Sequence, residues 1–583
     1  MWRGPRIRLA VALAVVCFNA WVVVHFHDQF WWAPDEGNYA HVAERVLNGE
    51  VLHADVQDIH PGYVNFVNAA ALGLFGRELV SMRYPLVILG VVQCAIIFAI
   101  LAPVGLVAAA AGATIITALG FVQFLNPTAH WYALFLVILL AGVLQARWRH
   151  ARWRLDAVGA IVVATLMFRQ LSGVFVAMGA ITFLLLEPSG DLPDRPTALT
   201  ARPWAARGLI AVMLLGLAGY LVRATEQVGW LLFGIWPLLL LLWAARSTRM
   251  SNRDVVSMVL VLARGGVAAA LPLVLYHAAH RSLGAWYQDT VIAATQFPRM
   301  PFFERMNYGD HLVNAVRSAA GSGVPGALNG VFWVLLTVMA VVVGCLLLMQ
   351  IVRSDRGDSS EAPPALPILA VFYAVVSVHY QIPIYLTYTA GLSLVALIWL
   401  ARGARSVIAG GVALAAIALY YHAGQPLSRG LGGATAGQRP DLVAARSLPR
   451  VGLRIEPADI ELYGALITLI QHEVPTGSTI FAVPSHAELY FLADRPNPFP
   501  FFNTALGVRT EGDLATVLST LERDPPTLVF YDRQDKYNTR ESRAIIAQVK
   551  ATFETLPPIG QFEIFRRPGH SVAARPAAQS SRE

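Results

Sequence analysis

Charged residues are scarce in this chain. Only 14% of its 583 residues are Asp, Glu, Lys or Arg, whereas a soluble protein carries roughly a quarter. The mean hydropathy is +0.54, and the apolar residues form runs of about 15 to 24 residues, the length that crosses a hydrocarbon core. Such runs must be helical, because lipid offers no partner for backbone N–H and C=O groups. The composition therefore excludes a soluble globular protein and predicts a polytopic membrane protein.

Cysteine is almost absent as well. Cys17, Cys94 and Cys345 lie inside apolar runs without metal-ligand spacing, so we expect neither a disulfide framework nor a thiolate metal site. The net charge is +7, nearly all the basic charge is on arginine, and the arginines cluster in short segments between apolar runs. That distribution is typical of orientation signals, so it does not indicate a nucleic-acid-binding face.

The apolar runs predict thirteen membrane spans. They lie near residues 8–26, 79–101, 104–124, 128–145, 155–168, 171–187, 208–224, 229–245, 255–277, 328–351, 365–379, 385–401 and 405–421. The first run follows three arginines and resembles a signal peptide. It lacks a small-residue cleavage site and is followed by an aromatic cluster, so we expect an uncleaved span.

The segments between spans predict the orientation. With the N-terminus in the cytoplasm, five successive internal segments are basic, as expected for a bacterial inner-membrane protein. They contain Arg147, Arg149, Arg152 and Arg154; Arg195, Arg202 and Arg207; Arg246, Arg249 and Arg253; Arg353 and Arg356; and Arg402 and Arg405. Two long segments, 27–78 and 278–327, then lie on the outer, periplasmic face, where binding and chemistry usually occur.

The C-terminal part differs from the membrane domain, residues 1–421. Residues 422–583 begin with a glycine-rich stretch and then alternate helical and strand patterns, which predict a small α/β domain in the periplasm. We expect helices near 457–473, 485–492, 510–523 and 541–555, and strands near 479–483, 527–531 and 562–565. The domain has no GxGxxG, P-loop or nucleophile elbow, so nothing in it indicates catalysis. Acceptor recognition is one hypothesis for its role.

The first outer segment carries a group of polar residues. Asp35 and Glu36 open an amphipathic helix that ends at Asn48-Gly49, and a second short helix begins at Pro61 and ends near Gly76. Asp58 and His60 lie between these helices, so we expect the carboxylates at the membrane edge. A purely structural interpretation stays open, because Asp35 is a good N-cap residue and Asp58 and His60 could be a solvated pair.

This segment resembles the first periplasmic loop of GT-C superfamily glycosyltransferases. The similarity lies in residues 34–40 (Pro-Asp-Glu-Gly-Asn-Tyr-Ala), 43–50 and 58–62, and extends to the topology of the whole chain. The nearest members are the protein O-mannosyltransferases and the bacterial transferases that place aminoarabinose on lipid A. One difference is that this chain has Ile59-His60-Pro61 where the aminoarabinose transferases have Glu-Lys-Pro.

The resemblance implies a polyprenyl-phosphate sugar as donor and an acidic residue of this loop at the catalytic centre, which here is Asp35 or Glu36. Independently of the family, a phosphate leaving group needs little acid assistance, whereas the acceptor hydroxyl needs a base. We predict Asp35 as that base in a single displacement with inversion, Glu36 as a residue that orients the acceptor, and Tyr39, Asp58 and His60 as donor or acceptor ligands. Asp35 and Glu36 could instead bind Mg²⁺ or Mn²⁺, which prefer oxygen ligands.

The donor phosphate requires cations near the outer leaflet. Arg169 lies between two short apolar runs at their predicted outer ends, where an arginine is costly unless it is paired or functional, although snorkelling to the interface would also explain it. Arg299 and Arg305 are further candidates, or simply part of a basic membrane-surface segment. His379-Tyr380 is similar to a position that many of these transferases fill with polar residues facing the lipid phosphate, but an ordinary interfacial pair is the alternative.

Two other functions remain open at this point. A lipid or glycan transporter, or flippase, would show internal repeats and charges near midspan, whereas the polar group here is at the outer edge. A non-catalytic scaffold would use Asp35 and Glu36 only as helix caps. The sequence does not identify the sugar, the acceptor (glycan, lipid or protein) or the oligomeric state.

Overall fold

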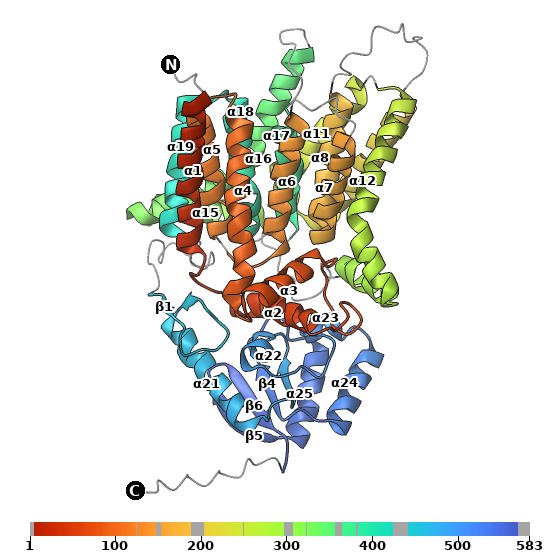
Figure 1. The fold of residues 1–583 in the computed structure, drawn as a ribbon, viewed down its shortest axis with the longest axis vertical. Coiled ribbons are helices and arrows are strands. Elements are labelled where there is room, and N and C mark those ends of the chain that lie inside the picture. Colours follow the sequence, from red (N-terminus) through yellow and green to blue (C-terminus); the bar gives the residue numbers. More distant parts are fainter. Residues whose placement is uncertain are drawn as a thin grey trace.

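The computed structural model describes residues 5–123, 125–146, 153–187, 203–248, 250–296, 307–321, 323–355, 364–379, 383–423 and 441–569. A bundle of long helices forms one end of the molecule and an α/β domain forms the other, with two short helices between them (Figure 1). The predicted fold class is therefore confirmed: a polytopic α-helical membrane protein with a small C-terminal α/β domain.

Each of the thirteen predicted spans coincides with a helical segment in the described part of the chain. The segments are α1 (Pro5–Phe26), η1 (Leu79–Arg83) with α4 (Tyr84–Leu101), α5 (Leu106–Ala118) with η2 (Phe121–Gln123), α6 (Ala129–Gln145), α7 (Trp153–Phe168), α8 (Gln170–Leu186), α9 (Trp204–Ala224), α10 (Gln227–Gly229) with η3 (Trp230–Gly234) and α11 (Ile235–Ser247), α12 (Asn252–Ala279), α16 (Gly323–Asp355), α17 (Ala365–Ala374) with η6 (Val375–Val378), α18 (Pro383–Leu400) and α19 (Arg405–Tyr421).

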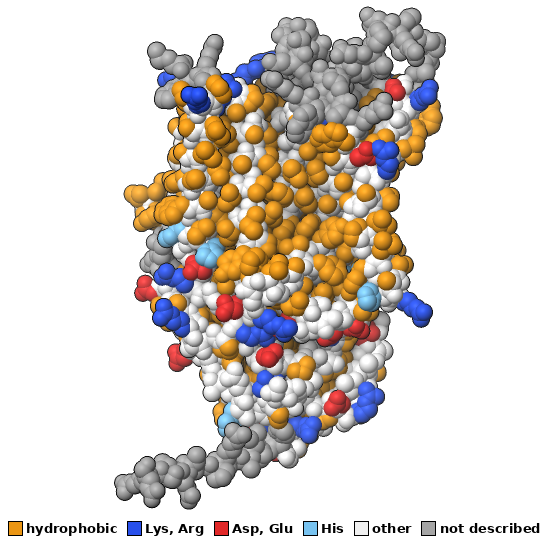
Figure 2. Space-filling model, viewed as in Figure 1, with side chains coloured by type: hydrophobic (Ala, Val, Ile, Leu, Met, Phe, Trp, Pro, Cys, Tyr) orange, Lys and Arg blue, Asp and Glu red, His pale blue; other side chains and the backbone are white. Residues whose placement is uncertain are grey.

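The surface of the bundle is apolar around its middle. Seven of the described helices are long and apolar enough to cross a membrane, and six shorter apolar helices accompany them. Figure 2 shows the hydrophobic side chains as a broad belt over the bundle, with charged side chains gathered beyond it on both sides. A belt of this kind is stable only in contact with lipid, because exposed apolar patches of this size are rare on soluble monomers.

The two long outer segments contain short helices next to the bundle. The first segment folds into α2 (Ala33–Leu47) and α3 (Tyr63–Phe75), which lie between the bundle and the C-terminal domain (Figure 1). The second contains α13 (Leu283–Tyr287), η4 (Gln288–Ala293), α14 (Ala294–Gln296) and α15 (Tyr308–Gly321). The prediction of two helices in the first segment is confirmed, with α3 starting two residues later than expected.

The C-terminal domain contains a four-stranded mixed sheet in the order β3-β4-β6-β5. Its elements are β3 (Ile480–Val483), β4 (Leu528–Asp532), β5 (Glu554–Ile559) and β6 (Phe562–Arg566), with α21 (Pro457–Glu473), α22 (Glu488–Ala493), α23 (Thr504–Gly507), α24 (Glu511–Arg523) and α25 (Arg540–Thr552). β1 (Val443–Ala444) and β2 (Arg454–Ile455) form a separate two-stranded sheet. β3 and β4 are parallel, whereas β4, β6 and β5 pair antiparallel.

The C-terminal domain packs directly against the first outer segment. A side chain at Gly37 of α2 would overlap the backbone and Cβ of Glu488 at the start of α22, so only glycine permits this approach. The backbone N–H of Phe30 donates to the carbonyl of Arg454 at 2.8 Å, and the N–H of Arg454 donates to the carbonyl of Asp28 at 2.7 Å. Apolar residues of the first outer segment and of the C-terminal domain are also buried together in one hydrophobic core, which stabilises the contact between them.

Candidate functional site

A cavity of about 1990 Å³ lies where the bundle, α2 and the C-terminal domain meet. Its walls come from α2, the loop 57–60, the adjoining ends of α7 and α8, the end of α9, η4, α18 and the loops that follow β3 and β4. On one side the lining includes Leu215 and Val222 of α9, whose side chains are 75% and 70% exposed on the bundle surface. The cavity therefore extends from the polar domain to the lipid-facing side of the bundle.

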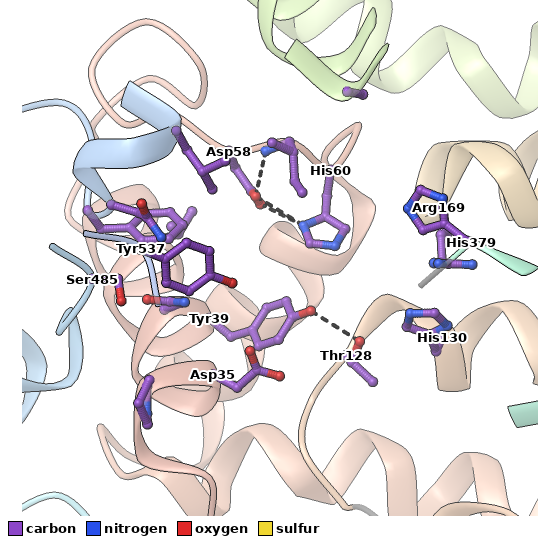
Figure 3. Close-up of a pocket in the computed structure, with 18 of the residues that line it drawn as sticks. Asp35, Tyr39, Asp58, His60, Thr128, His130, Arg169, His379, Ser485 and Tyr537 are labelled. Carbon is purple, nitrogen blue, oxygen red and sulfur yellow. Dashed lines mark hydrogen bonds and ion pairs between the residues drawn. The ribbon is translucent and has the colours of Figure 1, made fainter. Parts of the chain in front are cut away.

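Asp35 lies in the wall of this cavity, in the first turn of α2. Trp32 occupies the N-cap position of the helix, so the interpretation of Asp35 as the capping residue is wrong. The Asp35 Oδ2 atom accepts a hydrogen bond from Asn126 Nδ2 at 2.9 Å, and the side chain remains exposed to the cavity. In Figure 3, Asp35 and Tyr39 lie between Ser485 and Tyr537 on one side and His130, Arg169 and His379 on the other.

The surroundings of Asp35 set its affinity for a proton. The protein around the Asp35 carboxyl reduces its hydration, and this desolvation raises its pKa above the usual value. The positive charges of Lys536 and His60 and the hydrogen bond from Asn126 oppose that shift. A carboxylate with a raised pKa is a stronger base, which suits proton abstraction from a hydroxyl group.

Glu36 is buried in an ion pair with Arg83 and does not line the cavity. Its carboxylate accepts two hydrogen bonds from Arg83, with Arg83 Nη2 2.5 Å from Glu36 Oε1, and both side chains are 1% exposed. Arg83 also donates to the carbonyls of His27, Gln29 and Phe30. Glu36 is therefore bound beneath the cavity wall and is not available to orient an acceptor. Instead, the pair fixes the first turn of α2 that carries Asp35.

Tyr39, Asp58 and His60 line the same cavity as Asp35. The Tyr39 hydroxyl donates to Thr128 Oγ1 at 3.1 Å, and its ring centroid lies 5.7 Å from that of His60. Asp58 accepts from His60 Nδ1 at 3.0 Å and from Asn65 Nδ2 at 2.7 Å. Burial opposes ionisation of Asp58, but the charge of His60 and these hydrogen bonds together lower its pKa. The solvated-pair interpretation is wrong, because Asp58 is only 8% exposed.

Arg169 lies at the N-terminus of α8 on the bundle side of the cavity. Its guanidinium donates to Ser172 Oγ at 3.0 Å and lies 5.4 Å from the ring centroid of Tyr385, and the residue is 7% exposed. Arg169 therefore faces the cavity and does not snorkel to the membrane surface. His379 lines the same wall, with its ring 6.5 Å from Tyr385. The other predicted phosphate ligands, Arg299, Arg305 and Tyr380, lie outside the described residues.

The C-terminal domain supplies residues that the sequence did not indicate. Ser485 and His486 follow β3, Asp532 is the last residue of β4, and Asp535, Lys536 and Tyr537 follow it. All six residues line the cavity. Lys536 is one of only two lysines in the chain and lies close enough to Asp35 to lower its pKa. Arg223 of α9 is a further cation in the lining. The only signal in the sequence for these residues was their position at or just after the ends of two predicted strands.

The predicted metal ligands do not form a shared site. Glu36 binds Arg83, so it cannot chelate an ion together with Asp35. Across the described residues, no group of three or more His, Cys, Asp or Glu side chains is arranged to hold a metal ion.

No protein-family model and no curated protein matches this chain. Among solved structures, it is similar to the crystal structure of ArnT from Cupriavidus metallidurans bound to undecaprenyl phosphate. The identity is 13%, the TM-score is 0.36, and the match covers 96% of this chain and 97% of that chain. The apo structure of ArnT from Cupriavidus metallidurans is 12% identical, with a TM-score of 0.34 and the same coverage.

At a TM-score of 0.36 the likeness carries no argument about activity. The cavity itself combines the exposed carboxylate of Asp35, several cations and an apolar side on the lipid-facing surface of the bundle.

Proposed function

We propose that the protein is an inverting glycosyltransferase that moves a sugar from a polyprenyl-phosphate donor to an acceptor of the cell envelope. The observation that carries this proposal is the position of Asp35, whose exposed carboxylate lies in a cavity that reaches both the lipid-facing surface of α9 and the polar C-terminal domain. A lipid-linked sugar and a polar acceptor can meet only in a space of this kind.

In the proposed reaction, Asp35 accepts the proton of the acceptor hydroxyl as the hydroxyl oxygen attacks the anomeric carbon. The bond between that carbon and the phosphate oxygen breaks, and the polyprenyl phosphate leaves with the bonding electrons. One base and no covalent intermediate imply inversion at the anomeric carbon. The raised pKa of Asp35 supports the role of base, and Asn126 holds its carboxylate in place.

The donor phosphate fits the bundle side of the cavity. Arg169 and Arg223 are positioned to interact with the negative charge that develops on the leaving phosphate, and Tyr385 and His379 complete this wall. The isoprenoid chain would extend along α9, where Leu215, Gly216 and Gly219 line the cavity and the two glycines leave open space around their Cα atoms.

The location follows from the same geometry. We propose that the protein is a multi-pass protein of the bacterial inner membrane, with the cavity and the C-terminal domain on the periplasmic side. The predicted basic segments support this orientation. A transporter is the less favoured alternative, because the charged residues that line the cavity lie at one end of the bundle and not near midspan.

The test is complementation of a deletion strain. Cells carrying Asp35→Asn should lack the glycan or glycolipid that wild-type protein restores, as measured by mass spectrometry of the cell envelope, while the membrane content of the protein is unchanged. Removing a general base typically lowers the rate by about 10²- to 10⁴-fold. Asp55→Asn is the matched control, because Asp55 is exposed in the same outer segment outside the cavity lining and should support wild-type transfer. Full restoration by Asp35→Asn would refute the proposal.

A further inference from the structure

The beginning of α18 contributes two tyrosines to the wall of the cavity near Arg169. Tyr385 and Tyr388 lie three residues apart, so they share one face of the helix, and both side chains are buried. Both residues line the cavity that contains Asp35. Their hydroxyl groups differ, however, in whether the protein itself supplies a hydrogen-bonding partner.

The Tyr385 hydroxyl is bonded within the protein. It lies 3.1 Å from His130 Nε2, and the Arg169 guanidinium lies 5.4 Å from the centroid of the Tyr385 ring. For the Tyr388 hydroxyl, no hydrogen-bonding partner occurs among the residues that the structure describes, and the oxygen is not sealed inside the protein as that of Tyr132 is. Because Tyr388 is buried apart from its place in the cavity wall, this hydroxyl opens into the cavity.

The ring of Tyr388 is held in one position by other aromatic rings. His130 stacks on it with a centroid distance of 4.1 Å and an interplanar angle of 9°, and Trp131 contacts it edge-on at 4.5 Å. A phenylalanine would make the same ring contacts, so the hydroxyl contributes nothing to this packing. A polar group without a partner in a buried side chain carries a desolvation penalty. The hydroxyl of Tyr388 is therefore better explained by a ligand of the cavity than by the fold.

The position of Tyr388 relative to the reacting groups indicates which part of a ligand it meets. In a single displacement, the attacking oxygen, the anomeric carbon and the leaving oxygen lie in line, so the transferred sugar lies between the base and the phosphate site. Asp35 and Arg169 stand on different walls of the cavity (Figure 3), and the charges of both act on Tyr388. Tyr388 therefore adjoins the space that the sugar must occupy.

We infer that the Tyr388 hydroxyl hydrogen-bonds the sugar of the polyprenyl-phosphate donor and helps to select it. This inference rests on the proposed function, because it assigns a contact to the group that is transferred. A phenol can donate one hydrogen bond and accept another, which suits a hydroxyl or amino group on a sugar ring. A site that bonds such a group discriminates against an analogue without it, because the protein group then stays unpaired. Tyr388 thus distinguishes sugars that differ at one ring position.

The experiment compares a polyprenyl phosphate with and without its sugar. The probes are undecaprenyl phosphate and the polyprenyl-phosphate sugars extracted from membranes of the deletion strain, where unused donor should accumulate. Both are added to nanodiscs that contain the full-length protein, and native mass spectrometry measures the bound ratio of sugar-bearing to bare lipid. In Tyr388→Phe this ratio should fall about threefold to tenfold, the loss expected for one neutral hydrogen bond, while binding of undecaprenyl phosphate is unchanged.

Tyr132→Phe is the matched control. The Tyr132 hydroxyl also lacks a partner in the described part of the chain, but it is sealed within the bundle outside the cavity lining, so the ratio should equal that of the wild type. An unchanged ratio in Tyr388→Phe would overturn the inference, and so would a parallel loss of both lipids, which would place Tyr388 at the phosphate. In these two outcomes the wild-type protein still retains the sugar-bearing lipid, so the proposed function stands. If the wild type bound no sugar-bearing lipid, the proposed function and the inference would both be refuted.

Discussion

At the scale of single residues, the cavity separates two neighbouring acids into different roles. Asp35 and Glu36 are adjacent in the sequence, but the helical turn points Asp35 into the cavity and Glu36 toward Arg83. The sequence could indicate that an acid at this place was functional, because two carboxylates beside a membrane edge are unusual. It could not tell which of them faces the cavity, since the partner of Glu36 is 47 residues away in the sequence.

The proton affinity of Asp35 should respond to Lys536. Because the carboxylate must be ionised to act as a base, activity should be lost as the pH falls through the raised pKa of Asp35. Lys536→Met removes a positive charge that lowers this pKa, so the acidic limb of the pH–rate profile should move to higher pH, and Lys536→Arg should leave it near its wild-type position. An unchanged acidic limb in Lys536→Met would show that Lys536 does not act on Asp35.

The buried ion pair between Arg83 and Glu36 should stabilise the folded protein. Arg83→Met leaves a buried carboxylate without its partner, which costs about 3–5 kcal/mol in other proteins. We therefore expect a large fall in the denaturation midpoint of the purified protein and a loss of transfer. The double variant Arg83→Met/Glu36→Gln should recover part of the stability, since it no longer buries an unpaired charge. If Arg83→Met were as stable as the wild type, the ion pair between Arg83 and Glu36 would not contribute to stability.

At the scale of elements, the position of Asp35 depends on the contact between α2 and α22. Gly37 allows the two helices to touch, and nearby Arg450 binds both Glu44 and Asp494. Together these contacts hold α2 against the C-terminal domain, so the loops after β3 and β4 stay opposite Asp35.

Gly37→Val should disturb this contact. Its side chain would overlap Glu488, which cannot move easily because its carboxylate is bonded to Tyr463 and His486. We expect a lower denaturation midpoint and at least a tenfold loss of transfer, by analogy with overpacked cores, which lose about 1–3 kcal/mol. Gly464→Ala in α21 is the control, because its Cβ would meet Leu448 only at 3.8 Å and should not be destabilising.

The elements of the bundle were the part most accessible from sequence. Hydropathy alone located the thirteen spans, since each must be apolar over its whole length whatever its neighbours are. β5 was missed because Pro557 and Pro558 interrupt it and its side chains are largely exposed, so it lacks the alternation of a half-buried strand. The sites at Ser485 and Asp532 were missed because they form only when two distant strands pair in parallel.

At the scale of the whole molecule, the first outer segment and the C-terminal domain share one hydrophobic core. Trp31, Leu72 and Leu79 of the membrane domain pack in the same cluster as Ile455 and Leu466. The C-terminal domain is thus completed by residues that precede it by several hundred positions. The predicted boundary at residue 422 separates an apolar part of the sequence from a more polar part. The hydrophobic core nevertheless contains residues from both sides of this boundary.

This shared core makes the isolated C-terminal domain incomplete. A fragment spanning residues 441–569 would expose the apolar face that normally covers α2 and α3. We expect the fragment to aggregate or to bind hydrophobic dyes such as ANS. In the full chain in detergent, the C-terminal domain should not bind the dye, because the first outer segment covers its apolar face. A monomeric fragment with a sharp thermal transition would contradict the prediction and would indicate an autonomous domain.

The apolar side of the cavity along α9 also determines how the proposed donor arrives. A molecule entering past Leu215 and Val222 comes from within the bilayer plane and not from bulk water. Its encounter rate then depends on its density per area of leaflet and on lateral diffusion, so membrane fluidity becomes a kinetic variable. Dilution into micelles would separate enzyme and donor into different particles, whereas proteoliposomes keep both in one continuous sheet at any vesicle concentration.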